Sequence, residues 1–248
     1  MCTEKATEAI LAIDTATEVC SVALLSREAI LYEKVNQEGL NHAALIMGFC
    51  RGALDFAQDQ KLHLVAIAVN GGPGSYTGLR IGASFAKGLC FGKHLPLIAL
   101  SGLCAMASGY HKHLLEQKEE LPQSKALLCP MIDARRMEVY CALYDFDGNE
   151  VAAPQAEIIT QESFSQYSQD RKIYFFGNGA LKCREALQSP KAHFEAFPSL
   201  ARHLQELAFE AYDQERFADV AYWVPNYIKP YMALKSKNKV LSRIIPQQ

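Results

Sequence analysis

The alternation of apolar and polar positions in the first hundred residues predicts a unit of strands and helices. Short apolar and β-branched segments separated by polar turns indicate strands, whereas apolar residues at helical spacing indicate helices. Asn41 can cap the first helix, and Ser101 opens the third. The expected strands cover residues 10–13, 19–25, 29–35, 64–69 and 96–100. The expected helices run from 42 to about 58, from the glycine-rich loop 71–78 to about 93, and from 101 to about 117.

The second half of the chain shows the same order of strands and helices. A polar segment at 114–125 contains a proline, which ends the third helix and marks a surface connection. The expected elements beyond it are strands at 126–132, 138–144, 156–159 and 173–176 and a helix at 200–212.

Two similar turns support an internal duplication. Segments 13–19 and 132–139 share an Ile-Asp start and a Glu-Val end, and their offset of 119 to 120 residues is about half the chain. A chance match of two strand-turn-strand units is the alternative. A repeated β-meander followed by helix, strand and helix is the plan of the actin-like, sugar-kinase and Hsp70-like fold. We therefore expect an α/β chain with a duplicated actin-like, ribonuclease H-like fold.

The duplication predicts two lobes, an N-terminal one at 1–104 and a C-terminal one at 105–248. The last helix is a candidate to pack back on the first lobe. The hydrophobic share of 50% supplies apolar material for two cores, and with 21% charged residues it excludes a mainly disordered protein.

The charge distribution limits contacts with nucleic acid to local regions. A formal net charge of −2 argues against a protein that binds nucleic acid over its whole surface. The end of the chain is different, because no acidic residue follows Asp219. Its basic residues are Lys229, Lys235, Lys237, Lys239 and Arg243.

Cysteine spacing and apolar run lengths indicate the compartment. The eight cysteines are never closer than twelve residues, so no C-x-x-C zinc or redox pair exists and we interpret them as small core residues. The N-terminal apolar run is too short for a signal-peptide core. A long stretch without Lys, Arg, Asp or Glu, 94–111, falls short of the ~20 apolar residues of a membrane helix. We expect a cytoplasmic chain with no membrane partner.

The strongest local signal is the glycine-rich segment 70–82 between a predicted strand and helix. Glycines allow positive φ and close approach, and Ser75 or Thr77 can cap the helix, so an anion or a partner can bind there. The glycine spacing matches neither a P-loop nor a dinucleotide fingerprint, and a tight turn without a ligand is the alternative. The candidate residues are Asp14, Gly72, Gly74, Ser75, Thr77, Gly78 and Arg80.

Asp14 and Asp133 each lie where a predicted strand ends at a turn. Actin-like kinases hold a metal-bound phosphate at such positions and have a glycine two residues later, where this chain has Ala16 and Arg135. Formation of the turn itself is the alternative role for both aspartates. No two histidines have the i, i+4 spacing of one helix face, so we expect no histidine metal site.

The first two helices have wider apolar faces than packing on one sheet requires. Apolar residues cover about 200° of the first helix, whereas a stripe of ~100° suffices. On the second helix, Ile81, Phe85 and Leu89 are expected to face the core, and small residues beside them to face another helix. Burial of both helices between the lobes is the alternative to a dimer surface. The predicted interface residues are Leu45, Ile46, Phe49, Gly82, Ala83, Ala86 and Cys90.

Four segments together resemble the TsaB (YeaZ) family, whose members are subunits of the bacterial complex that makes threonylcarbamoyladenosine on tRNA. They are ILAIDTATEVCSVAL at 10–24, GGPGSYTGLRIG at 71–82, MIDARRMEVY at 131–140 and PNYIKP at 225–230. The resemblance spans nearly the whole chain. It departs from the family at Tyr76, where Phe is frequent, and at Lys229, where Arg is frequent.

The resemblance implies a non-catalytic subunit that pairs with a catalytic TsaD-like paralogue. It implies that a TsaE-like ATPase acts on the pair and that tRNA is reached through the complex, where the threonylcarbamoyl group is transferred to the adenosine beside the anticodon. ATP and metal then belong to the partner proteins, and this subunit holds no cofactor. A homodimer is expected when the chain is alone. The paralogue has a two-histidine metal site on the helix corresponding to 42–58, where this chain has His42 alone.

Two classes of function remain open. One is a scaffold subunit, and the other is a stand-alone ATP-dependent kinase or metallopeptidase-like enzyme of the same fold. Ala16 in place of a glycine, the absent histidine pair and the absent P-loop lysine favour the scaffold. The basic tail beyond Lys229 either contacts tRNA phosphates in the complex or is a solvated chain end.

Overall fold

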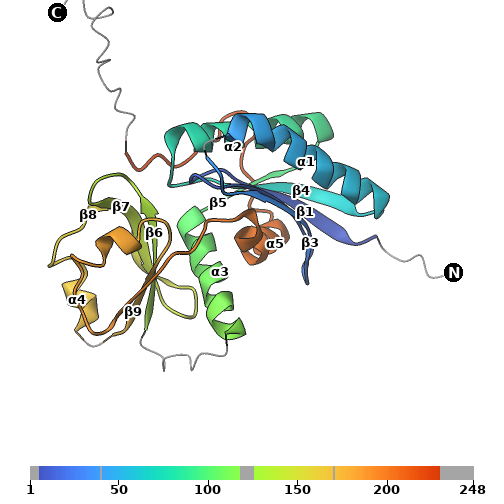
Figure 1. Cartoon of the computed structure of the whole chain (residues 1–248). Helices are drawn as coiled ribbons and strands as arrows, with labels where there is room; N and C mark the ends of the chain where they lie inside the picture. The colour runs from blue at the N-terminus through green and yellow to red at the C-terminus, as the bar shows by residue number, and fades with distance from the viewer. Residues whose placement is uncertain (1–5, 40, 118–125, 170, 230–248) are drawn as a thin grey trace, which may run out of the picture.

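The computed structural model describes residues 6–39, 41–117, 126–169 and 171–229 of the chain. These residues form two five-stranded sheets, one in each half, with helices packed on them (Figure 1). Within these ranges, no helical segment combines the length and the hydropathy of a membrane span. The basic residues from Lys235 to Arg243 lie outside the described residues.

The elements follow the predicted order. The strands of the first half are β1 (Glu8–Asp14), β2 (Cys20–Leu25), β3 (Ile30–Asn36), β4 (His63–Asn70) and β5 (Leu97–Leu100). Its helices are α1 (His42–Asp59), α2 (Tyr76–Lys93) and α3 (Gly102–Glu116). The second half has β6 (Leu127–Asp133), β7 (Glu138–Tyr144), β8 (Glu150–Ile158), β9 (Ile173–Phe176) and β10 (Ala192–Glu195). Its helical segments are α4 (Ser165–Ser168), α5 (Gln205–Asp213) and the 3-10 helices η1 (Leu181–Cys183) and η2 (Ala201–Leu204).

The two sheets have the same strand order. The first is β3-β2-β1-β4-β5 and the second is β8-β7-β6-β9-β10. In each, the central strand pairs antiparallel with the strand that follows it and parallel with the third strand after it. Asp14 and Asp133 are the last residues of the two central strands. The chain therefore has a duplicated actin-like, ribonuclease H-like α/β fold, and the predicted duplication is confirmed.

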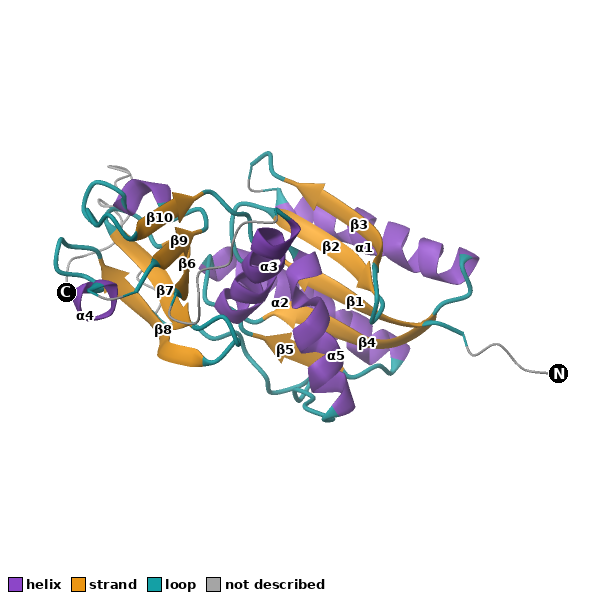
Figure 2. Ribbon diagram, turned by 90° about the horizontal axis from the view of Figure 1, so that it is seen from below, coloured by secondary structure: helices purple, strands orange, loops and turns teal. Residues whose placement is uncertain are grey.

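Helices cover both faces of the first sheet. α1 and α2 lie on one face, and α5 and η2 lie on the other (Figure 2). Cys50 of α1 and Cys90 of α2 are buried in the first of these layers. Burial raises the pKa of both thiols to about 12, so they remain protonated and act as small apolar side chains, as predicted.

α3 lies between the two sheets (Figure 2). Tyr110 stacks on Phe176 of β9 with ring centroids 3.9 Å apart, and Leu103 is buried in the same cluster. Ala105, on the same helix, belongs to the core of the first lobe. The proposed boundary between residues 104 and 105 falls inside this helix and stays a prediction.

The C-terminal segments return to the first lobe. Arg27 donates two hydrogen bonds to the Asp213 carboxylate at 2.6 and 2.7 Å, which ties the end of α5 to the turn after β2. Ala218 N–H then donates to Leu97 O at 2.8 Å, so the chain continues along the edge strand β5. α5 therefore packs on the first sheet.

Some local expectations differ from the structure. The Ser101 side chain caps α3, but the Asn41 side chain makes no capping bond, and the Asn41 carbonyl accepts from the first turn of α1 instead. β8 begins at Glu150, before the predicted start, because its pairing with β7 continues to Tyr144. β10, α4 and η1 span three or four residues each, which is too few for a periodic pattern to predict them.

His203 of η2 is a half-buried histidine whose Nδ1 atom is enclosed where the ring packs against α3. Its ring stacks on Phe197 with centroids 4.9 Å apart, and no partner is found for its Nδ1 in the described parts of the chain. Burial, reinforced by the nearby charges of Arg202 and Lys112, lowers the pKa of His203 to about 3. An unfolded histidine titrates near 6.5, so the unfolded chain binds this proton first, and stability is lost as the pH falls from about 6.5 toward 3.

His203→Phe is therefore expected to flatten the pH dependence of stability. The wild type should lose about 2 kcal/mol between pH 7 and pH 5 through this group, and the variant should not. Urea unfolding at the two pH values measures the difference, with the exposed His94→Phe as the matched control. Equal losses in the wild type and in His203→Phe would contradict the assignment.

Candidate functional site

The glycine-rich loop packs directly on the turn between β1 and β2. A Cβ atom at Gly74 would overlap the carbonyl oxygen of Ala16, and one at Gly78 would overlap that of Thr15. Gly82, one turn further along α2, lies against the Thr15 side chain in the same way. These glycines are required for close approach. Gly72 is the loop residue whose backbone has a positive φ angle, which is 107°.

Hydrogen bonds close the start of α2. Ser75 N–H donates to Ala16 O at 2.7 Å, and Ser75 Oγ caps the helix by accepting from Gly78 N–H at 3.3 Å. The Thr15 hydroxyl donates to Gly78 O at 2.8 Å. A carbonyl oxygen thus lies at the helix N-terminus, where an anion would need free N–H donors. This arrangement supports close packing rather than anion binding as the role of the loop.

Asp14 is enclosed at the centre of this packing, with 2% of its surface exposed. Its Oδ1 accepts from Ala16 N–H at 2.9 Å, and its Oδ2 accepts from Asn70 Nδ2 at 2.9 Å and from Ser199 Oγ at 2.6 Å. Asn70 Oδ1 accepts in turn from Gly72 N–H at 2.9 Å. The carboxylate therefore joins three distant parts of the chain, which supports a turn-forming role over a phosphate or metal ligand.

Three side chains of this region were not among the predicted site residues. Asn70 immediately precedes the glycines, and a polar residue that ends a buried strand is the signal that could have found it. His42 donates from Nε2 to Thr17 O at 2.7 Å and so holds the turn to the start of α1. Ser199 is separated from Asp14 by most of the chain, and no local pattern marks it.

Thr77 and Arg80 lie on the outer side of the loop and are exposed. The Arg80 guanidinium lies 5.5 Å from the ring centroid of Tyr76. Tyr76 also packs on Tyr227 of the C-terminal segment, with centroids 4.8 Å apart. Tyr76, Thr77 and Arg80 form one end of a groove between α1 and α2.

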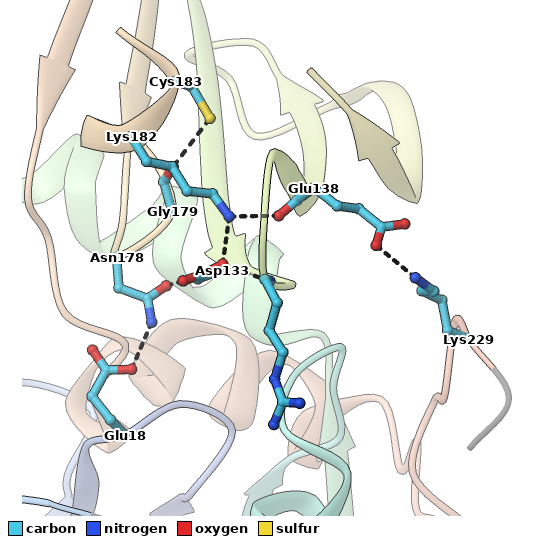
Figure 3. Close-up of polar contacts among 9 residues, drawn as sticks. Glu18, Asp133, Glu138, Asn178, Gly179, Lys182, Cys183 and Lys229 are labelled. Atoms are coloured by element: carbon cyan, nitrogen blue, oxygen red, sulfur yellow. Dashed lines mark hydrogen bonds and ion pairs between the residues drawn. The ribbon is translucent and has the colours of Figure 1, made fainter. Parts of the chain in front are cut away.

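The corresponding turn of the second lobe, between β6 and β7, is open. Asp133 has a side chain that is 44% exposed, pairs with Lys182, and accepts from Arg135 N–H at 2.7 Å (Figure 3). Asp133 N–H donates to Asn178 Oδ1 at 3.0 Å, and Asn178 Nδ2 donates to Glu18 at 2.6 Å. Glu18 belongs to the β1–β2 turn, so the two turns are linked through Asn178.

The predicted dimer interface requires a correction. The small residues of α2 face the sheet of their own lobe, and the larger residues Ile81, Phe85 and Leu89 are half-buried at the groove. The two ridges are thus exchanged, because small side chains let α2 lie close to the strands and the β1–β2 turn. Leu45 and Phe49 of α1 are half-buried. The predicted interface residues that are buried within the chain are Ile46, Gly82, Ala83, Ala86 and Cys90.

The outer face of α1 and α2 is apolar nonetheless. A groove of about 520 Å³ runs between the two helices, and a second hollow of about 490 Å³ continues along them. Met47 and Phe85 border both, and Met47 is 67% exposed. This surface faces away from α3 and α5, so the alternative of burial between the lobes does not apply to it (Figure 1).

Three glycines on these helices pack against nothing in the parts of the chain that the structure describes. A Cβ at Gly48 of α1, or at Gly88 or Gly92 of α2, would meet no atom there within 4 Å. Gly52 and Gly82, by contrast, face Tyr32 and Thr15 closely. A glycine inside a helix lowers stability by about 0.5–1 kcal/mol relative to alanine.

The described ranges contain no cluster of side chains that could form a metal site. No group of three or more His, Cys, Asp or Glu side chains there is arranged to hold a metal ion.

Comparison with known proteins places the chain among tRNA-modification proteins. A family model described as TsaD, tRNA N6-adenosine threonylcarbamoyltransferase, matches residues 33–241. The chain is 29% identical over 226 residues to the tRNA threonylcarbamoyladenosine biosynthesis protein TsaB of Bacillus subtilis, covering 89% of this chain and 93% of the relative. It is 37% identical over 144 residues to the protein of that name from Escherichia coli, covering 57% of each. YeaZ from Pseudomonas aeruginosa superposes with a TM-score of 0.70 at 26% identity, covering 89% of this chain and 99% of that chain.

The orientation of α2 predicts that an arginine destabilises the chain on the buried side of this helix but not on its exposed side. Ala86 is fully buried against the sheet, so Ala86→Arg is expected to destabilise the chain by about 3–5 kcal/mol through an unpaired buried charge. Ser84→Arg, on the exposed side of the same helix, should leave the melting temperature nearly unchanged. Circular dichroism during heating of each purified chain measures both, and a stable Ala86→Arg would show that α2 is rotated from the orientation described.

Proposed function

The chain belongs to the TsaD family of tRNA N6-adenosine threonylcarbamoyltransferases, in which its named relatives are TsaB (YeaZ) proteins, and we propose that it is a scaffold subunit for threonylcarbamoyladenosine synthesis on tRNA. In this proposal the chain binds a catalytic TsaD-like paralogue through the outer face of α1 and α2. The paralogue transfers the threonylcarbamoyl group to the adenosine next to the anticodon. The exposed helical glycines Gly48 and Gly88 are the observation that carries the proposal.

A helix of a partner protein would explain why glycine occupies positions 48 and 88. Each lowers the stability of its helix, and each lies where a side chain would meet only open space in this chain. Glycine lets the backbone of a second helix approach closely, and the apolar groove beside Met47 and Phe85 gives that helix a surface to cover. The same features would be of no use on a face that stays in water.

A paralogue of the same fold suits this surface. A protein with the same architecture offers an equivalent pair of helices, so two such pairs can meet about a two-fold or pseudo-two-fold axis. A second copy of this chain offers the identical face. We therefore expect a homodimer when the chain is alone and a heterodimer when the paralogue is present.

The enclosed Asp14 supports a role outside catalysis. A stand-alone kinase would need this carboxylate open to a metal-bound phosphate, but Asp14 is 2% exposed and already accepts three hydrogen bonds. The carbonyl of Ala16 lies at the helix N-terminus where a phosphate would bind. In the proposed complex, ATP and metal are held by partner proteins, a TsaE-like ATPase acts on the pair, and tRNA is bound by the assembly.

Reconstitution tests the proposal. The purified chain, the TsaD-like paralogue and the ATPase are combined with the small-molecule substrates and a tRNA transcript, and modified adenosine is quantified by mass spectrometry. Modification is expected with the chain present and not when it is omitted. Full modification without the chain, or modification by the chain alone, would contradict a scaffold role.

Gly48→Leu/Gly88→Leu separates folding from assembly. At a concentration at which both chains are monomers, the double variant should melt at a higher temperature than the wild type, since leucine favours the helix by several tenths of a kcal/mol at each site. It should nevertheless lose binding to the paralogue and tRNA modification. Analytical ultracentrifugation measures the pairing. The control is Gln188→Leu, at an exposed position of the second lobe. Wild-type pairing by the double variant would exclude this face as the interface.

A further inference from the structure

The turn between β6 and β7 has an unusual backbone. Arg135 and Arg136 have φ angles of 74° and 52°, so two consecutive residues with side chains are left-handed. Asparagine and glycine are the residues that favour this conformation in a hairpin turn. Both arginines are exposed, so burial of their side chains does not explain their presence.

The surrounding contacts hold this turn firmly. Asp133 accepts from Arg135 N–H at 2.7 Å, and Ala134 N–H donates to Glu138 O at 3.1 Å. Lys182 pairs with Asp133 and donates to Glu138 O at 2.7 Å, which joins the two ends of the turn (Figure 3). A strained conformation that its neighbours fix in this way is typical of a binding site.

The charges around the turn leave the two arginines unneutralised. Lys182 is paired with Asp133, and Lys229 is paired with Glu138 at 2.6 Å (Figure 3). No carboxylate lies within ion-pair distance of either Arg135 or Arg136 in the ranges that the structure describes. The turn therefore presents two free guanidinium groups.

The basic end of the chain begins at the same place. Lys229, which contacts Glu138 beside the turn, is the last residue described. The sequence after it contains no acidic residue. Its further basic residues are Lys235, Lys237, Lys239 and Arg243.

We propose that Arg135 and Arg136 bind the phosphate backbone of RNA, which rests on the proposed function for tRNA as the RNA concerned. Guanidinium groups match phosphate oxygens in a bidentate geometry. Two neighbouring arginines on an exposed turn, neither of them in an ion pair among the described residues, fit a ligand that repeats its negative charge along its length. An acidic protein surface is the competing ligand, and the experiment below distinguishes it.

The experiment uses three variants of the full chain, alone and in complex with the paralogue. Arg135→Ser/Arg136→Ser removes the two charges. Arg135→Asn/Arg136→Gly removes them and installs residues that favour the turn, so its melting temperature should rise above that of the wild type. Lys34→Ser/Arg171→Ser is the control, because it changes the net charge equally at exposed positions away from the turn.

Binding of a tRNA transcript is measured at several salt concentrations. Both turn variants should bind about tenfold more weakly than the wild type at low salt, and the slope of log K against log salt should shrink by about 1 to 2. The control should retain wild-type affinity and slope. Pairing with the paralogue should be unchanged in all three.

Three results would overturn the RNA contact: a wild-type slope in the turn variants, an equal loss in the control, or no tRNA binding by the wild type in either form. Loss of pairing with the paralogue, at unchanged tRNA affinity, would assign the arginines to an acidic protein surface instead. The Gly48→Leu/Gly88→Leu variant tests separately whether the α1–α2 face binds the paralogue. The proposed function and the RNA contact can therefore be rejected independently of each other.

Discussion

The contact between the backbone of the β1–β2 turn and the first turns of α2 determines the arrangement of the first lobe. Gly74 and Gly78 bring the helix against the carbonyls of Ala16 and Thr15, where no larger residue fits. This contact encloses Asp14 and orients α2 so that its small residues face the strands. The apolar groove between α1 and α2 is a consequence of that orientation, because the larger residues of α2 then lie on its outer side.

The duplicated lobes use equivalent turns differently. The β1–β2 turn is filled by α2, and its aspartate is buried, whereas the β6–β7 turn is open and holds Asp133 by Lys182 and a backbone N–H. What remains exposed is an apolar helical face on one lobe and a rigid basic turn on the other, which suits a protein that acts by binding macromolecules.

Sequence alone predicted the fold but not the orientation of its helices. The hydrophobic periodicities and the repeated Ile-Asp turn were sufficient for the order of the main elements along the chain and for the duplicated fold, since both are local patterns. The small residues of α2 were assigned to the wrong partner, because a helical wheel cannot distinguish close approach to a strand from close approach to a helix. Ser199 and Asn178 reach their partners only through tertiary folding, so no pattern along the chain predicted them.

Oxidation footprinting of methionines tests the central claim, that partners bind the outer face of α1 and α2. Met47 is 67% exposed and Met137 is 38% exposed in the chain, whereas Met106 and Met131 are buried and serve as internal standards. At a concentration at which the chain alone is a monomer, adding the TsaD-like paralogue should protect Met47 while Met137 keeps its rate. Protection of Met137 with no change at Met47 would contradict the account.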